Sequence, residues 1–116
     1  MKLTLQEAER MMAENNGSLD IRYDTRYTEL PEGLTVDGNL DISYTGLREL
    51  PENLTVGGGL YMEHTKIKKL PEGLTVGGWL DAMGSEIKEL PEGLIVGEAL
   101  DISDTEIKEL PEGLMV

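Results

Sequence analysis

The sequence contains no cysteine and no phenylalanine, and aromatic residues make up only 4% of its 116 residues. Without cysteine the chain forms no disulfide and no thiolate metal site. With so few aromatic residues, its core has to be built from leucine, isoleucine and valine, which suits thin, regular layers. No apolar run approaches the length that spans a membrane. The N-terminal residues also lack the apolar stretch of a signal peptide, so we expect a cytoplasmic protein.

Basic residues are scarce as well. Ten Lys and Arg stand against 23 Asp and Glu, and the formal net charge is −13. Because proteins bind nucleic acid largely through Lys and Arg on phosphates, direct binding of nucleic acid is disfavoured. The excess of acid suits a solvated surface, a basic protein partner or mimicry of nucleic acid. An acidic inhibitor of a nucleic-acid-binding protein, as found in phages, is therefore one alternative function.

A repeat of constant length dominates what the sequence does contain. The segment Leu30–Val36 reads LPEGLTV and recurs, with at most one change in each copy, as Leu50–Val56, Leu70–Val76, Leu90–Val96 and Leu110–Val116. One repeat cannot bury its own apolar side, but stacked repeats turn each apolar position into a continuous ladder. The ladders that we expect inside are Leu40, Leu60, Leu80 and Leu100; Ile42, Met62, Ala82 and Ile102; and Leu47, Ile67, Ile87 and Ile107.

The pattern within each repeat predicts strands. Apolar and polar residues alternate over Leu40–Ser43, as in a half-buried strand, and a second short strand is expected at Leu34–Val36. A whole coil separates successive strands, so they should pair in parallel. Prolines exclude helix on the far side of each coil, and glycines before each strand allow a tight turn. Residues 19–116 are thus predicted to form one right-handed β-solenoid.

Two further features modify this solenoid. An imperfect first copy begins at Leu19, and one extra residue within 22–28 predicts a bulge or widened turn. Small hydroxyl residues recur once in each repeat, and we expect them to face inward and to bond backbone groups of the turn. They are Thr45, Thr65, Ser85 and Thr105.

The two ends of the chain differ. Residues 1–18 are predicted to cap the first coil, with Thr4 and Glu7 forming a capping box and a helix over residues 4–15. The last repeat has no such cap, which predicts that its apolar side pairs with a second copy in a homodimer. The alternative is that the chain is a fragment of a longer protein. The apolar stripe expected on the helix is Leu5, Ala8, Met11 and Met12.

The repeat resembles that of bacterial leucine-rich repeat proteins of the 20-residue class, found in secreted effectors of pathogens. The match runs over about residues 19–116, at Leu40, Ile42, Leu47, Leu50 and Pro51 and at the equivalent later positions. Thr or Ser replaces the ladder Asn of that family, and Gly-Leu-Thr-Val replaces its second Leu-Pro pair. The resemblance implies an α/β fold: a right-handed β-solenoid of leucine-rich-repeat type behind an N-terminal capping helix. It also implies protein binding through the outer strand face. Some members carry a ubiquitin-ligase domain with a catalytic Cys, which is absent here.

Variation between the repeats marks a candidate binding surface. Positions fixed by stacking stay constant, whereas the positions that flank each strand vary and should point outward. The only tryptophan falls among them, and Trp and Tyr are enriched in binding hot spots. The predicted protein-binding residues are Tyr61, Trp79 and Met83, with Tyr44 and His64 at the edge and Tyr23 and Tyr27 as an extension.

No catalytic constellation is visible in the sequence. His64 is the only histidine, and it is interpreted as a surface residue. Calcium favours carboxylates, but Tyr61 interrupts the column of Asp41, Asp81 and Asp101. A glycosidase-type pair of carboxylates stays open, since any two acidic residues could approach each other. We expect no metal, no cofactor and no enzymatic activity. The main prediction is a non-enzymatic protein-binding module, with the acidic inhibitor and a self-assembling structural solenoid as alternatives.

Overall fold

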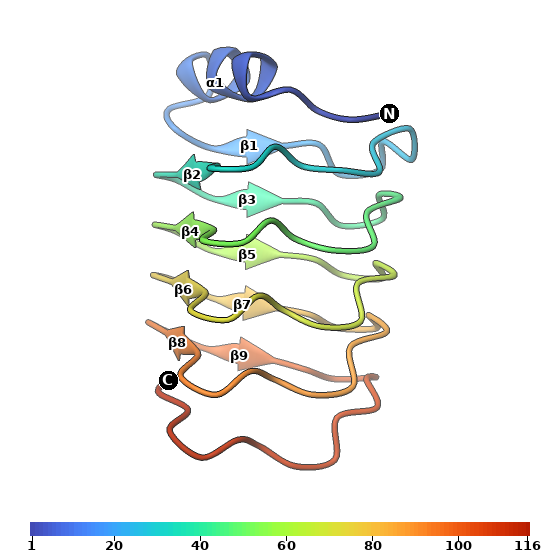
Figure 1. The fold of residues 1–116 in the computed structure, drawn as a ribbon, viewed down its shortest axis with the longest axis vertical. Helices are drawn as coiled ribbons and strands as arrows, with labels where there is room; N and C mark the ends of the chain where they lie inside the picture. The colour runs from blue at the N-terminus through green and yellow to red at the C-terminus, as the bar shows by residue number, and fades with distance from the viewer.

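The computed structural model describes all 116 residues as a stack of coils behind a single helix, α1 (Figure 1). Two parallel sheets run along the stack, one of five strands in the order β1-β3-β5-β7-β9 and one of four in the order β2-β4-β6-β8. The first sheet contains β1 (Leu19–Asp20), β3 (Leu40–Asp41), β5 (Leu60–Tyr61), β7 (Leu80–Asp81) and β9 (Leu100–Asp101). The second contains β2 (Thr35–Val36), β4 (Thr55–Val56), β6 (Thr75–Val76) and β8 (Ile95–Val96).

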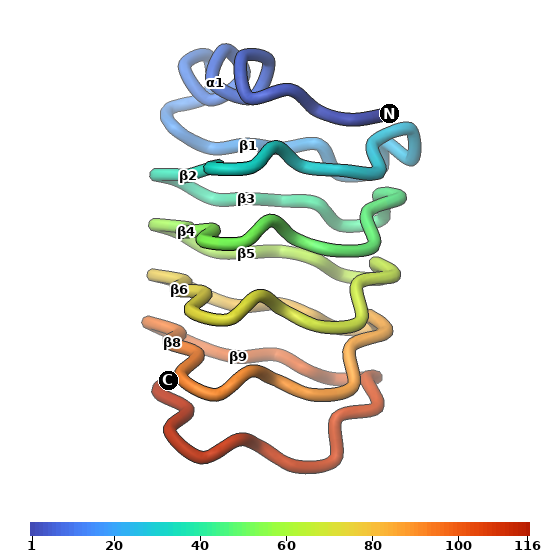
Figure 2. Tube along the Cα trace, viewed as in Figure 1, coloured from blue at the N-terminus to red at the C-terminus, as the bar shows by residue number.

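The pairing register repeats the sequence register. Leu40 pairs with Leu60 in the first sheet, and Val36 pairs with Val56 in the second. The predicted parallel solenoid and its second strand are therefore confirmed, and Figure 2 shows each coil following nearly the same path as the one before it. The strands of the first sheet are shorter than the predicted Leu40–Ser43, because the chain turns a corner at Tyr44, whose φ is 59°.

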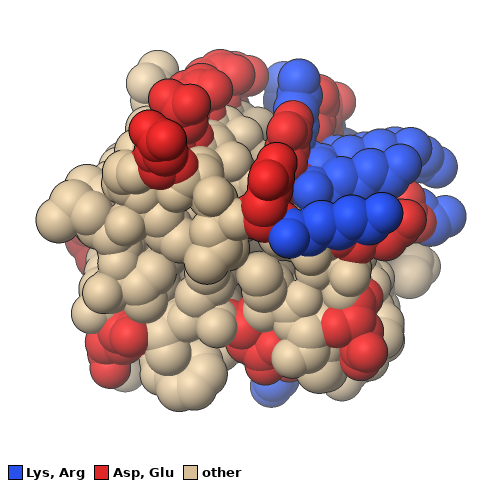
Figure 3. Space-filling view, turned by 90° about the horizontal axis from the view of Figure 1, so that it is seen from below, with Lys and Arg blue, Asp and Glu red and all other residues tan.

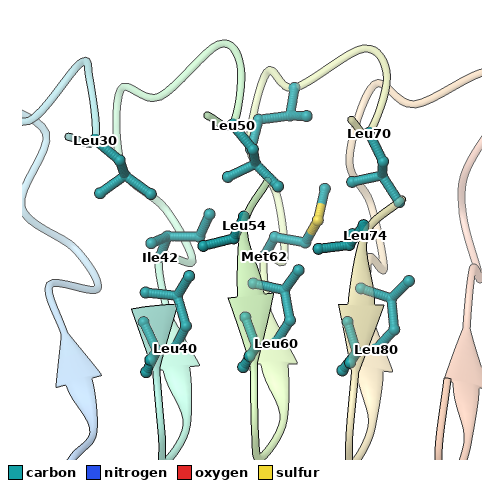
Figure 4. Packing of buried hydrophobic residues seen from close by; sticks show 14 of the residues in the cluster. Leu30, Leu40, Ile42, Leu50, Leu54, Leu60, Met62, Leu70, Leu74 and Leu80 are labelled. Carbon is teal, nitrogen blue, oxygen red and sulfur yellow. The ribbon is translucent and has the colours of Figure 1, made fainter. Parts of the chain in front are cut away.

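The core is a single aliphatic cluster of 25 buried residues that runs through the stack. Rows of leucines from successive coils face one another across the interior, as Figure 4 shows for Leu40, Leu60 and Leu80. One ladder varies in size along its length, since Met62 precedes Ala82 and both are fully buried. The long side chain of Met62 extends toward the next coil (Figure 4), where it fills the room that the small alanine leaves.

Glycine is required where neighbouring coils meet backbone to backbone. A Cβ atom added to Gly77 would collide with the carbonyl oxygen of Gly57, and one added to Gly97 would collide with that of Gly77. The same corner carries Asp37 in the first full coil, where Cβ of Asp37 lies against Gly17. Close stacking therefore explains why this column reads Asp once and Gly afterwards.

Helix α1 (Leu5–Ala13) covers the first coil and makes the predicted capping box. The N–H of Glu7 donates to Oγ1 of Thr4 (3.1 Å), and the N–H of Thr4 donates to Oε1 of Glu7 (3.2 Å). The helix ends at Ala13, earlier than predicted, in a turn where the N–H groups of Asn15 and Gly17 both donate to the carbonyl oxygen of Met12. This chain has no helix of the length and hydrophobicity that crossing a membrane requires.

The apolar side of the cap differs in part from the prediction. Ala8 is fully buried as expected, but Leu5 is 39% exposed, so its place in the buried stripe was wrong. Leu3, which precedes the helix, is fully buried instead. The reason is that the N-terminal residues form an extra extended rung, in which the N–H of Leu3 donates to the carbonyl oxygen of Glu29 (3.0 Å).

The hydroxyl column closes the corner after each strand of the first sheet. Oγ1 of Thr45 donates to the carbonyl oxygen of Ile42 (2.7 Å), and Thr65 and Thr105 make the equivalent bonds to residues 62 and 102. Ser85 is the exception, because its Oγ is buried and has no partner. In that coil the backbone N–H of Ser85 donates to the carbonyl oxygen of Ala82 (3.1 Å).

We predict that Ser85→Thr stabilises the protein by about 1 kcal/mol, because the threonine hydroxyl supplies the bond that its three counterparts make. Urea unfolding followed by circular dichroism measures this change. The reverse substitution, Thr65→Ser, is the matched control and should lower the free energy of unfolding. A Ser85→Thr variant that is less stable than the parent would contradict this account of the column.

Candidate protein-binding surface

The outer face of the first sheet carries a column of aspartates that accept backbone hydrogen bonds. Oδ1 of Asp41 accepts the N–H of Ser43 (3.1 Å), and Oδ1 of Asp81 accepts the N–H of Met83 (3.1 Å). Asp20 and Asp101 accept the N–H two residues on in the same way. Each carboxylate therefore satisfies a backbone donor where its strand ends.

Tyr61 occupies the same column but accepts no hydrogen bond from the backbone N–H two residues on. In its coil the N–H of Glu63 donates instead to Oγ of Ser43 in the preceding coil (3.1 Å). The ring of Tyr61 lies over Gly59, where an added Cβ would come within 2.7 Å of the ring. Since nothing in the turn depends on its side chain, Tyr61 is available for contacts outside the fold.

The corner after the first sheet holds a column of residues in the left-handed backbone region. Their φ angles lie between 53° and 68°, a region in which bulky residues are outliers and glycine is unstrained. The first three members are nevertheless rings. The column consists of Tyr23, Tyr44, His64, Gly84 and Asp104.

The three rings stack along the solenoid. The ring centroids of Tyr23 and Tyr44 are 5.0 Å apart with an interplanar angle of 18°, and those of Tyr44 and His64 are 4.9 Å apart with an angle of 26°. The imidazole covers Gly84, since a Cβ added there would lie 2.5 Å from Cε1 of His64. We call Tyr23, Tyr44 and His64 the aromatic ladder. It is open to solvent, with Tyr23 68% and Tyr44 39% exposed.

The structure divides the predicted site residues between two neighbouring places. Tyr44 and His64 lie in the aromatic ladder, at the corner. Tyr61, Trp79 and Met83 lie on the outer face of the first sheet, where Trp79 is 47% exposed and the other two are partly buried. The prediction included Tyr23 only as an extension of the binding surface. Its spacing from Leu19 equals that of Tyr44 from Leu40, which indicates that both residues belong to one column.

Glu63 lies on the same outer face and is surrounded by acid. A hydrogen bond with Asp81 is the main reason that the pKa of Glu63 is raised from 4.5 to about 7. Partial burial and the negative charges of Asp81, Asp41 and Asp101 add to this shift of the pKa. The structure contains no group of three or more His, Asp or Glu side chains arranged to hold a metal ion.

Comparisons of the chain with protein-family models, curated proteins and solved structures found no match. The geometry itself is that of a stacked-coil solenoid with repeats of about 20 residues, compatible with a leucine-rich type of repeat. Function is therefore inferred from the sequence and the structure alone.

We predict that stability falls between pH 4.5 and about 7 through Glu63. The folded chain holds this proton more tightly than the unfolded chain does, so the stabilisation is fully present below pH 4.5 and is lost as the pH rises through about 7. Solvent screening limits the effect to about 1 kcal/mol.

Glu63→Gln, which stays neutral, should remove this contribution and be more stable than the parent at pH 8. The measurement is chemical unfolding at a series of pH values, with Glu32→Gln at an exposed corner as the control. Equal pH profiles for the parent and Glu63→Gln would refute the assignment.

Proposed function

We propose that this chain is a non-enzymatic protein-binding module, whose binding surface is the aromatic ladder together with the adjoining outer face of the first sheet. The observation that carries the proposal is the presence of three stacked rings, two of them bulky tyrosines, at a corner where the backbone favours glycine. The coil itself does not need them, because the same position holds Gly84 and Asp104 in later coils.

The energetics of the ladder support this interpretation. A non-glycine residue in the left-handed region costs roughly 1 kcal/mol or more, whereas an aromatic pair returns about 0.5–1.5 kcal/mol. Two stacked pairs therefore offset at best the strain of three residues. Backbone outliers that the fold does not repay are typical of functional sites.

The composition of the surface favours a protein partner. Tyr and Trp present large apolar faces with polar edges, and both are enriched where proteins bind one another. Trp79, the only tryptophan, is nearly half exposed on the adjoining face. The resemblance to bacterial leucine-rich repeat proteins, which implies binding through the outer strand face, points to the same surface.

We predict that Tyr44→Asn with His64→Asn abolishes partner binding while the fold is retained. Asn tolerates positive φ, as Asn53 shows in this chain, so unfolding should change by no more than about 1 kcal/mol. Affinity capture from the native host's lysate should recover at least tenfold less partner with the double variant than with the parent. Asp104→Asn, in the same column beyond the ladder, is the matched control. Undiminished capture by the double variant would exclude the ladder as the site.

One observation favours the acidic inhibitor as a second candidate. All the ion pairs of the structure involve residues of the first two coils: Lys2–Glu29, Arg22–Asp20, Arg22–Asp41 and Arg26–Asp24. The later carboxylates have no cation within 4.0 Å and are free to meet a basic partner. Figure 3, seen from the C-terminal end, shows most Lys and Arg gathered on one side, with acidic groups beside them and also around the rest of the rim. A partner that the double variant keeps but that high salt releases would favour this candidate.

Self-association is a further proposal, resting on the outer side of the last coil. Leu110, Met115 and Val116 are each more than half exposed there. A second copy of the chain packed against these three side chains would cover them.

Sedimentation equilibrium tests this self-association. We expect a mass that rises toward that of a dimer with increasing concentration for the parent chain, and a constant monomer mass for Leu110→Lys with Met115→Lys, because charge on the apolar end opposes its burial. Thr55→Lys on the outer face of β4 is the control and should associate as the parent does. A parent chain that stays monomeric at high micromolar concentration would rule out the dimer.

A further inference from the structure

A shallow hollow of about 500 Å³ opens on the outer face of the first sheet, beside the turn that follows α1. It lies apart from the corner that carries the aromatic ladder. Most of the side chains that line it are polar, and they come from the α1–β1 turn and from the first three strand segments of this sheet. Its lining includes Asn15, Asp20, Arg22, Asn39, Asp41 and Tyr61.

The charged groups of the hollow, one guanidinium and two carboxylates, pair with one another. Nε of Arg22 lies 3.3 Å from Oδ2 of Asp20, and Nη1 of the same side chain lies 3.6 Å from Oδ2 of Asp41. The guanidinium therefore bridges two neighbouring strands. An anionic ligand would meet two carboxylates, and a cationic ligand would have to displace Arg22 from both of them, so the site favours a neutral ligand.

The amides add donors and acceptors without charge. Oδ1 of Asn39 accepts the N–H of Gly59 (2.7 Å), which fixes the amide and leaves its NH2 group as a free donor. Asn15 makes no side-chain hydrogen bond within the protein and offers both a donor and an acceptor. Carboxylates, amides and a guanidinium are planar groups that bind two adjacent hydroxyls at once, since each hydroxyl both donates and accepts.

Tyr61 supplies an apolar face beside these polar groups. Its ring keeps its place over Gly59 only because that residue has no side chain. The repeat does not require this arrangement, since the positions equivalent to Gly59 hold Asn39, Trp79 and Ala99, and those equivalent to Tyr61 hold aspartate. An aromatic ring next to planar polar groups matches a sugar, which presents C–H groups on one face and hydroxyls at its edge.

We propose that this hollow binds a neutral saccharide, with Tyr61 under the sugar ring and the Asp20–Arg22–Asp41 group and the two asparagines at its hydroxyls. The open shape suits one or two residues of an oligosaccharide at the protein surface. This inference does not rest on the protein-binding function proposed above.

Saturation-transfer NMR on the intact chain, with a panel of neutral trisaccharides of glucose, mannose, galactose and N-acetylglucosamine, tests the proposal. We expect at least one to bind in the millimolar range or tighter. Tyr61→Asp restores the residue of the repeat and therefore keeps the fold, and it should weaken that saccharide about tenfold. Gly59→Ala leaves every polar group of the hollow in place and should weaken it similarly by displacing the ring of Tyr61.

Two controls separate this site from the ladder and from the fold. Tyr44→Asn with His64→Asn should leave saccharide binding unchanged, and so should Thr55→Ala on the second sheet. The proposal is overturned if no saccharide of the panel binds, if Tyr61→Asp binds as the parent does, or if only the cationic probe arginine amide binds. Because the ladder variants are scored separately, failure here leaves the protein-binding proposal to its own test.

Discussion

Parallel hydrogen bonding of each coil to the next is the constraint on which the rest of this structure depends. Such bonding fixes the path of every coil to that of its neighbour, so the strands keep one register and the repeat is 20 residues long from Leu40 on. Side chains that point inward then meet their own counterparts, and Leu40 packs against Leu60 because the register allows no other partner. The same closeness excludes side chains at Gly57 and Gly77, whose missing Cβ atoms would collide with the preceding coil. Leucine ladders and glycine columns are thus two consequences of one spacing.

Departures from the repeat carry more information about function than the buried columns do, since stacking explains why those columns are constant. Some departures compensate one another within the core, as Met62 does for Ala82. Others loosen a structural bond: the coil of Tyr61 lacks the aspartate that caps its turn, and Ser43 of the preceding coil bonds the orphan N–H. A few departures add no net stability to the fold, and these are the ring of Tyr61, the exposed Trp79 and the aromatic ladder. They lie on the outer face of the first sheet and at the corner beside it, which is why both proposed sites fall there.

Much of this arrangement could be predicted from the sequence, because the period of the repeat determines which residues share a column and which face inward. The parallel sheets, the core ladders, the capping box of Thr4 and Glu7 and the hydroxyl bonds of Thr45 follow from spacing and from local chemistry. The stacking of Tyr44 on His64 could not be predicted, because it needs a left-handed backbone at a position where bulky residues are not expected. The burial of Leu3 in place of Leu5 could not be predicted from the sequence either, since it depends on backbone pairing with the distant residue Glu29. Repeats reveal which residues are neighbours, whereas the orientation of a side chain depends on backbone angles that the period does not encode.

The glycine corner has a consequence for how such a protein changes in length. A coil that leaves Gly57 and one that leaves Gly77 begin from equivalent positions and arrive at equivalent positions, so a whole coil can be removed or duplicated without disturbing any column. A change of another size has to be absorbed outside the strands, as the extra residue within 22–28 is, since Leu19 still pairs with Leu40. Gain and loss of entire units is therefore the route of variation that this architecture tolerates most readily, and a ligand-binding face can be widened or narrowed one rung at a time.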